Sequence, residues 1–218
     1  MLPFHPLKQL RHDLRDVKRS GKWVVNRFVR ETGIDDDARF IRSWLDNPLK
    51  TGAVSPSGKA LARMMASYVD EDSKGPVIEL GPGTGPVTDA LIEHGIAEER
   101  LVLVEFNPDF CTLLHKRYPK ALVIRGDAYA LERTLHGYLE QKAAAVVSSL
   151  PLYTRPEAQR LSLLREAFGL MQADAPFIQF TYAPASPMPK KAGGFRAEVS
   201  PRVWLNLPPA SVWVYRQD

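Results

Sequence analysis

The sequence predicts an α/β fold built on a mostly parallel sheet with helices on both faces. From Val77 onward, short apolar runs alternate with segments of helical periodicity, the pattern of repeated strand–helix units. The first run contains an acid and leads into three alternate glycines, as in a strand that feeds a nucleotide-binding turn. Two final apolar runs, separated by a proline-rich link, predict a terminal hairpin.

The first 34 residues predict a basic amphipathic helix that precedes this fold. Apolar side chains recur mostly at steps of three and four, and basic side chains fall largely between them. Residues 1–30 hold eight basic and two acidic side chains, whereas the rest of the chain is net acidic. Helices of this kind bind anionic lipid, although a helix packed on its own domain gives the same pattern. The side chains expected at a membrane are Lys8, Arg11, Arg15, Lys18, Arg19, Lys22 and Trp23.

Residues 35–218 are expected to form the single folded domain. The acids at 35–37 suit the N-terminus of a helix that ends before Pro48. A second helix begins at Ser57, whose hydroxyl suits an N-cap, with Met64 and Met65 packing inward. The strands are expected near residues 77–80, 101–105, 121–125, 144–149, 177–182, 203–206 and 212–215.

The segment Glu-Leu-Gly-Pro-Gly-Thr-Gly, residues 79–85, predicts a turn that approaches a ligand closely. Glycine lacks a Cβ, so Gly81, Gly83 and Gly85 allow positive φ and close contact between backbone and cofactor. A dinucleotide-binding turn would place its third glycine at position 86, which is proline here. The sequence therefore favours a different adenosine-containing cofactor.

Acids at the ends of the next two strands are expected to hold the same ligand. Glu105 lies 20 residues after Gly85, where a carboxylate accepts hydrogen bonds from ribose hydroxyls. Asp127 follows the next strand at the same sheet edge and is expected to accept a hydrogen bond from the adenine amino group. Together these features predict a site for S-adenosylmethionine.

The motifs Glu-Leu-Gly-Pro-Gly-Thr-Gly, Val-Glu-Phe-Asn and Gly-Asp-Ala resemble, in this order, the first three motifs of class I methyltransferases. The resemblance implies a Rossmann-like sheet of seven strands and S-adenosylmethionine as the cofactor. It also implies that Ser57 touches the cofactor carboxylate, with an ordinary N-cap as the alternative. The implied cofactor-binding residues are Glu79, Gly81, Gly83, Gly85, Glu105, Phe106, Asp127, Ala128 and Ser57.

Further segments resemble the small peripheral phospholipid N-methyltransferases of bacteria. They are residues 40–58, 101–110 and 149–152, within a resemblance that runs from about Arg39 to Arg216. Such enzymes convert phosphatidylethanolamine stepwise towards phosphatidylcholine. The resemblance implies a phospholipid substrate and a role in phospholipid biosynthesis.

The segment Ser-Leu-Pro-Leu-Tyr, residues 149–153, follows the fourth expected strand, where amine methyltransferases often carry Asn/Asp-Pro-Pro-Tyr or Asn-Leu-Pro-Tyr. Here Ser149 stands in the acceptor position and leucine precedes the aromatic, which counts against a base-methylating enzyme. Tyr153 and Tyr182 are candidates to accept a proton through water or to hold an ammonium by a cation–π contact. Lys190, Lys191 and Arg196 are candidates to bind the lipid phosphate from a loop after the fifth strand, unless that loop is simply solvated.

Composition limits the remaining possibilities. The five histidines lack the spacing of a metal site or a triad, so no metal is expected. The one cysteine excludes an internal disulfide and fits a reducing cytoplasm, and no apolar run approaches the roughly 20 residues that span a bilayer. We therefore expect a cytoplasmic protein that is monomeric in solution, associates with the inner face of the cell membrane and has no nucleic-acid partner. An RNA adenine N6-methyltransferase and a non-catalytic, cofactor-sensing membrane protein remain the alternatives.

Overall fold

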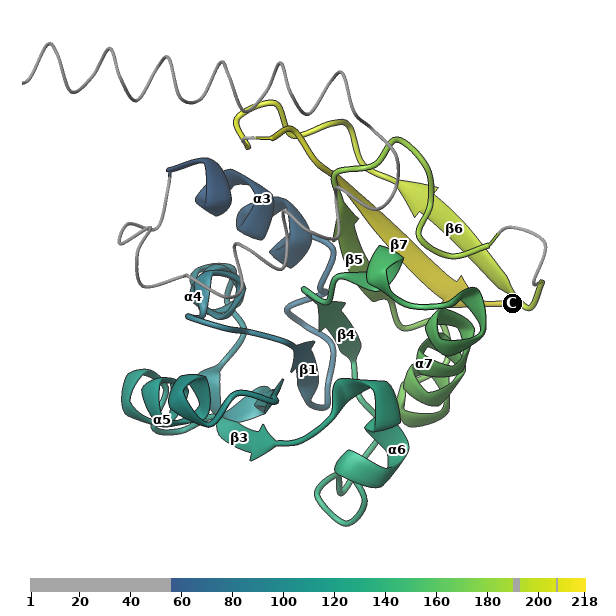
Figure 1. The fold of residues 1–218 in the computed structure, drawn as a ribbon. Helices are drawn as coiled ribbons and strands as arrows, with labels where there is room; N and C mark the ends of the chain where they lie inside the picture. The colour runs from purple at the N-terminus through teal and green to yellow at the C-terminus, as the bar shows by residue number, and fades with distance from the viewer. Residues whose placement is uncertain (1–55, 190–192, 207) are drawn as a thin grey trace, which may run out of the picture. The chain divides into compact units, whose positions relative to one another are not determined.

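A seven-stranded sheet in the order β3-β2-β1-β4-β5-β7-β6 organises the described part of the chain (Figure 1). The computed structural model describes residues 56–189, 193–206 and 208–218, all within one compact unit, Asn47–Asp218. The strands are β1 (Val77–Leu80), β2 (Leu101–Glu105), β3 (Leu122–Arg125), β4 (Ala145–Ser148), β5 (Phe177–Thr181), β6 (Phe195–Val199) and β7 (Ser211–Gln217). Strands β1 to β5 are parallel, and β7 is antiparallel to both β5 and β6. The predicted α/β class and seven-stranded sheet are confirmed.

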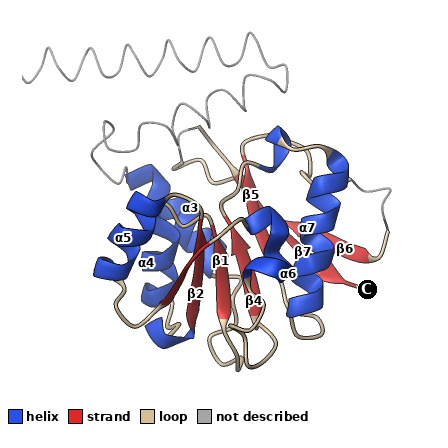
Figure 2. Ribbon diagram, turned by 60° about the horizontal axis from the view of Figure 1, so that its bottom comes forward, coloured by secondary structure: helices blue, strands red, loops and turns tan. Residues whose placement is uncertain are grey.

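Helices cover both faces of this sheet (Figure 2). The helices α3 (Pro56–Ala66), α4 (Pro86–Glu93) and α5 (Pro108–Arg117) share one buried apolar cluster with alternate residues of β1 and β2. The intervening strand residues form a second cluster with α6 (Leu131–Thr134) and α7 (Glu157–Leu170). Because successive side chains of a strand point to opposite faces, Val77 and Ile78 enter different clusters. Strands β1, β2 and β4 are buried along their whole length, which explains their continuous apolar runs.

The carboxyl ends of β1 to β5 lie at one side of the sheet, which we call the carboxyl edge. From β1 the chain adds β2 and β3 on one side, and then returns to add β4 and β5 on the other. Ligands of open α/β sheets bind outside the carboxyl edge where the strand order reverses in this way. The reversal lies between β1 and β4. At the carboxyl edge, short 3-10 helices follow β3 at Ala128–Ala130 and β4 at Leu152–Thr154.

The terminal hairpin uses a different first strand from the one predicted. Its strands are β6 and β7, whereas the expected strand at 203–206 is a turn in which Val203 makes an isolated bridge with Ala210. Prolines at 201, 208 and 209 lack the N–H that a continuous ladder needs, so the apolar run between them cannot extend the pairing. Strand β6 is mostly exposed, and its charged side chains suit an unpaired sheet edge.

The predicted arm at residues 1–34, the expected helix at 35–47, and Lys190 and Lys191 lie outside the described residues. Within the described ranges, no helix combines the length and the apolar character needed to cross a bilayer. No group of three or more potential metal-ligating side chains gathers among these residues either.

Candidate functional site

The glycine-rich turn joins β1 to α4 at the carboxyl edge. Gly81, Gly83 and Gly85 adopt φ values of 68°, 57° and 90°, which side-chain-bearing residues rarely adopt. A Cβ added to Gly85 would collide with the hydroxyl of Tyr118, whereas one added to Gly83 would meet nothing within 4 Å. Gly85 is therefore required by packing within the protein, and Gly83 borders open space in which a ligand can reach the backbone.

The carboxylate of Glu105 lies at the end of β2 and is almost fully buried. Its Oε1 accepts hydrogen bonds from the backbone N–H groups of Phe106 (2.9 Å) and Asn107 (2.8 Å). Its Oε2 accepts one from the N–H of Gly83 at 3.1 Å, which ties the carboxylate to the glycine turn. A carboxylate has about four acceptor positions, so Oε2 retains one for a further donor such as a ribose hydroxyl.

Phe106 and Asp127 flank the same region of the carboxyl edge. The N–H of Gly126 bonds the carbonyl of Glu105 at 3.0 Å, which places the loops after β2 and β3 side by side. The ring of Phe106 is 75% exposed, an unusual state for a large apolar side chain next to a buried carboxylate. Asp127 is exposed, and its Oδ1 accepts from the N–H of Tyr129 at 2.9 Å, while Ala128 is buried. An apolar ring and a carboxylate together suit the face and the amino group of adenine.

Glu79 is completely buried in β1 beneath the glycine turn. Its Oε2 accepts a hydrogen bond from Thr88 Oγ1 at 2.7 Å, and its Oε1 has no partner among the described residues. Burial raises the pKa of Glu79 to about 8, so the side chain is mainly a neutral acid at pH 7. A buried polar atom without a partner is rare in a folded protein, and it fits a site completed by a bound ligand.

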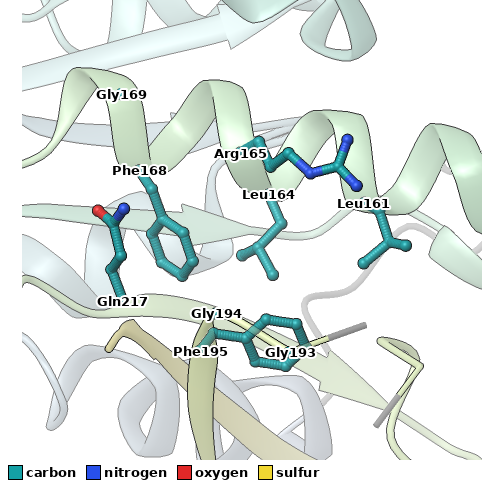
Figure 3. A pocket seen from close by; sticks show the side chains of 9 residues that line it. All are labelled: Leu161, Leu164, Arg165, Phe168, Gly169, Gly193, Gly194, Phe195 and Gln217. Carbon is teal, nitrogen blue, oxygen red and sulfur yellow. The ribbon is translucent and has the colours of Figure 1, made fainter. Parts of the chain in front are cut away.

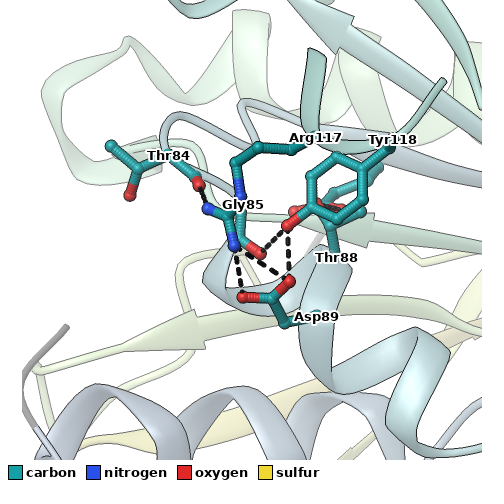
Figure 4. Close-up of polar contacts among 7 residues, drawn as sticks. Thr84, Gly85, Thr88, Asp89, Arg117 and Tyr118 are labelled. Atoms are coloured by element: carbon teal, nitrogen blue, oxygen red, sulfur yellow. Dashed lines mark hydrogen bonds and ion pairs between the residues drawn. The ribbon is translucent and has the colours of Figure 1, made fainter. Parts of the chain in front are cut away.

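A polar cluster that the sequence did not reveal fastens the glycine turn to α5 (Figure 4). Tyr118 Oη lies 2.8 Å from the carbonyl of Gly85 and 2.7 Å from Asp89 Oδ1. Arg117 pairs with Asp89 at 2.8 Å and also bonds the carbonyl of Thr84. The only sequence signal was an acid in the first turn of α4 and a base in the last turn of α5, which reads equally well as ordinary helix-end charge.

We expect Tyr118→Phe to lower the free energy of unfolding by about 1–2 kcal/mol, because it removes a buried hydroxyl that bonds the turn. Cofactor affinity should fall severalfold, since the turn loses one of its anchors. Urea unfolding and calorimetric titration with S-adenosylmethionine measure the two effects. Tyr138→Phe is the matched control, because that ring is 52% exposed and distant in sequence from the turn. Equal losses in the two variants would contradict the anchoring role.

The residues predicted to orient the acceptor lie beyond β4 and β5 at the carboxyl edge. The N–H of Ser149 bonds the carbonyl of Leu80 at 2.9 Å, so this segment begins beside the glycine turn. Tyr153 donates to the carbonyl of Ala185 at 2.8 Å, and the guanidinium of Arg160 lies 5.5 Å from its ring centre. Gln179, which the sequence did not single out, donates to the carbonyl of Leu150 at 3.0 Å and so fixes the segment from β5.

Tyr182 directly follows β5 and packs edge-on against Phe180, with 5.5 Å between the ring centres. Burial raises the pKa of Tyr182 above its ordinary value, although a hydrogen bond with Asn206 opposes the shift. The side chain is therefore a neutral phenol near pH 7. It can offer a hydroxyl or a ring face to an ammonium group, but not a phenolate that takes up a proton.

Arg196 does not lie where the sequence predicted it. It lies in β6 and pairs with Arg216 of β7. Because β7 is antiparallel to both β5 and β6, β6 runs in the same direction as β5, and Arg196 near its start lies far from the carboxyl edge. There it pairs with Asp174, and its Nη1 donates to the carbonyl of Gln217 at 3.1 Å. The placement of Arg196 in a loop over the site is wrong. Ser57 is the second residue of α3, inside the helix rather than before it as the predicted N-cap, and its side chain lies outside what the structure describes.

A cavity of about 350 Å³ lies between α7 and the start of β6, away from the predicted site residues. Figure 3 shows the apolar side chains of Leu164, Phe168 and Phe195 around it. Arg165 and Gln217 are the charged and amide side chains that line it. No candidate for cofactor or acceptor binding borders this cavity.

Comparisons with known proteins match the fold and, over part of the chain, the sequence. No family model matches. The chain is 27% identical over 148 residues to an ornithine lipid N-methyltransferase of Singulisphaera acidiphila, which covers 66% of this chain and 77% of that protein. It is 32% identical over 94 residues to ribosomal RNA small subunit methyltransferase A of a Synechococcus strain. That match covers 41% of this chain and 29% of the relative, so the chain spans less than a third of that relative's length.

Solved structures agree on the architecture. The CcbJ methyltransferase of Streptomyces caelestis superposes with a TM-score of 0.55 at 16% identity, covering 76% of this chain and 97% of that one. Magnesium protoporphyrin IX methyltransferase of Synechocystis, solved with bound S-adenosylmethionine, gives 0.54 at 11% identity over 91% of this chain and 97% of that one. The chain has the class I S-adenosylmethionine-dependent methyltransferase fold. The predicted cofactor, S-adenosylmethionine, is confirmed, and the predicted enzyme class, a methyltransferase that uses it, is supported.

Proposed function

We propose that this methyltransferase transfers methyl groups to the amine of a phospholipid head group at the membrane surface. The substrates are phosphatidylethanolamine and its mono- and dimethylated intermediates, and the product series leads towards phosphatidylcholine. The observation that supports a lipid amine as the acceptor is the similarity to a lipid N-methyltransferase over 77% of that protein. A ribosomal RNA substrate is the second candidate, because a shorter segment resembles an RNA methyltransferase.

The cofactor half of the proposed site lies over β1, β2 and β3. Glu105 would bind the ribose through the acceptor position left on its Oε2, and Phe106 and Asp127 would hold the adenine. The open space at Gly83 would admit the part of the cofactor nearest the glycine turn. Glu79 would complete this half with its Oε1, which has no partner in the part of the chain that the structure describes. S-adenosylmethionine supplies an activated methyl group when bound, so the protein needs no nucleophile of its own.

The acceptor half lies over β4 and β5. The segment from Ser149 to Tyr153 and the phenol of Tyr182 would orient the amine with its lone pair towards the methyl group. Held in this way, the amine would take the methyl group that the bound cofactor supplies, and the carbon–sulfur electron pair would stay with the cofactor. Because Tyr182 is a neutral phenol, the proton of the amine leaves to solvent rather than to this side chain. Holding and desolvating the two reactants is then the main contribution of the protein.

The proposal includes attachment to the inner face of the cell membrane through the basic arm at residues 1–34. That arm would contact anionic lipid with Lys8, Arg11, Arg15, Lys18, Arg19, Lys22 and Trp23, at about 1 kcal/mol for each engaged basic side chain. Residues 35–218 would form the catalytic domain, monomeric in solution, and Lys190 and Lys191 would meet the lipid phosphate. Replacing Lys8 and Arg11 should reduce sedimentation with anionic vesicles while leaving cofactor binding intact.

We expect label from S-adenosylmethionine to enter phosphatidylethanolamine vesicles, faster when anionic lipid is present. Thin-layer separation of the mono-, di- and trimethylated products shows where the reaction stops. Parallel reactions offer ornithine lipid vesicles and ribosomal RNA, and a Glu105→Gln variant reports background transfer. Label only in ornithine lipid would replace the substrate within the same class, and label only in RNA would overturn the lipid proposal. Cofactor binding without transfer to any acceptor would favour a sensor.

A further inference from the structure

An exposed tryptophan–leucine pair projects from the turn between β6 and β7. Trp204 is 75% exposed and Leu205 is 80% exposed, and the two are adjacent in sequence. Single exposed apolar residues are common on protein surfaces, but a neighbouring pair of this size at one turn is a candidate contact surface. The sequence singled out neither residue, because its apolar pattern placed both in a strand.

The turn that carries this pair is held in place by buried side chains and hydrogen bonds. Val203 is buried in the same apolar cluster as Leu61 and Met65 of α3, and its N–H bonds the carbonyl of Ala210 at 2.7 Å. Asn206 is also buried, and its Nδ2 donates to the carbonyl of Pro208 at 2.6 Å. The residues before and after the pair thus face inward, so the outward direction of the pair is fixed by the fold.

The turn also lies at the carboxyl edge. Strand β7 starts at Ser211 beside Thr181, the last residue of β5, so the chain just before β7 extends beyond that edge. Arg202 closes the connection, because its Nη2 donates to the carbonyl of Tyr182 at 2.9 Å and to that of Pro209 at 3.0 Å. The exposed pair is therefore connected through one side chain to a residue of the proposed acceptor half.

We propose that the Trp204–Leu205 turn inserts into the head-group region of a lipid bilayer and holds the carboxyl edge against it. Tryptophan is the side chain most typical of the membrane interface, because its ring is apolar and its N–H still finds a polar partner. The guanidinium of Arg202 lies 6.0 Å from the ring centre of Trp204, which places a cation beside the apolar pair and suits an anionic surface.

This inference rests on the proposed function and adds a geometric requirement to it. A lipid amine lies at the bilayer surface, so an enzyme that methylates it must present its acceptor half to that plane. A basic arm on a separate segment can concentrate the enzyme on the membrane, but it does not by itself orient the sheet. A rigid apolar contact next to Tyr182 orients it.

The first test places an environment-sensitive fluorophore on the turn. Cys111, the sole cysteine, is replaced by alanine, and Leu205→Cys is labelled in that background. The control is Glu140→Cys, an exposed position in the segment that leads into β4 at the opposite edge of the sheet. Vesicles of phosphatidylethanolamine with phosphatidylglycerol should raise the emission intensity from position 205 severalfold and shift that emission to shorter wavelength. The emission from position 140 should stay unchanged.

The second test measures turnover and needs no label. We expect the double variant Trp204→Ala, Leu205→Ala to raise KM for vesicles about tenfold while activity on dispersed short-chain phosphatidylethanolamine stays near that of the native chain, as the loss of an interfacial contact predicts. Tyr138→Ala, which removes another exposed aromatic ring, should change neither value.

The outcomes separate the inference from the function on which it rests. A silent probe at position 205 on vesicles that are being methylated would overturn the inference and leave the lipid substrate standing. A response at 205 without methylation of any lipid would support insertion and reject the proposed substrate. A response that depends on protein concentration and not on vesicles would identify a second copy of the chain as the partner, and would also overturn the inference.

Discussion

Glu105→Gln is expected to weaken S-adenosylmethionine binding about 100-fold, the largest effect of any single replacement in the cofactor half. The native carboxylate accepts three backbone hydrogen bonds and retains one acceptor position for the ribose. A glutamine amide loses the charge, and its NH₂ group faces donors that it cannot satisfy. With the amide nitrogen in the place of Oε2, the variant loses the charge-assisted bond to the ribose and the one from the Gly83 N–H that holds the glycine turn, and at about 1.5 kcal/mol each these two losses account for the factor.

Isothermal titration of the native chain and the variant measures this loss. Asp109→Asn is the matched control, because it removes the same charge from an exposed position four residues away. Circular dichroism checks that the loop after β2 has not unfolded. An affinity within threefold of the native value would show that Glu105 only organises its own loop.

In the native chain, the free energy of unfolding is expected to fall between about pH 5 and pH 8. We expect Glu79→Gln to abolish most of this fall. Burial raises the folded-state pKa of Glu79 to about 8, whereas the unfolded chain has the ordinary value of 4.5. Between these values the folded chain binds more protons than the unfolded chain, so the free energy of unfolding falls as pH rises. At 1.36 kcal/mol per pKa unit, the upper bound of the fall is on the order of 5 kcal/mol.

Urea unfolding without cofactor at pH 5.5, 7.0 and 8.5 tests this dependence. The slopes are compared rather than the absolute stabilities, because the glutamine amide also brings an extra donor into a buried site. Glu140→Gln, at an exposed position, should follow the native curve. Parallel curves for the native chain and Glu79→Gln would mean that Glu79 is ionised in the folded state at neutral pH.

The sequence predicted the parallel part of the fold closely because those strands are buried on both faces. The runs that start at Val77 and Leu101 are uniformly apolar except for one acid each, and both strands begin where expected. Strand β6 escaped detection for the opposite reason. Phe195–Val199 is largely exposed, and its strand character comes from pairing with β7, a partner that the local sequence does not reveal.

The same distinction applies to the site. Glycines and acids at strand ends lie within short motifs, so the motifs alone predict that Gly83 and Glu105 lie together, as their hydrogen bond shows. The link between Asp89 and Tyr118 spans 29 residues and depends on how α4 packs beside α5, which no local pattern encodes. Arg196 was misplaced because the loop and the strand that follow β5 were assigned to the wrong residues.

The strand order reverses at β1, so the proposed cofactor residues and the proposed acceptor residues lie on two different halves of one sheet. Residues proposed for the cofactor follow β1, β2 and β3, and residues proposed for the acceptor follow β4 and β5. Substitutions on one side can therefore accumulate with little effect on the other. A lineage that keeps Glu105 and the glycine turn can exchange one acceptor for another by remodelling only the later half of the chain, and an experimenter can do the same by directed evolution confined to residues after β4.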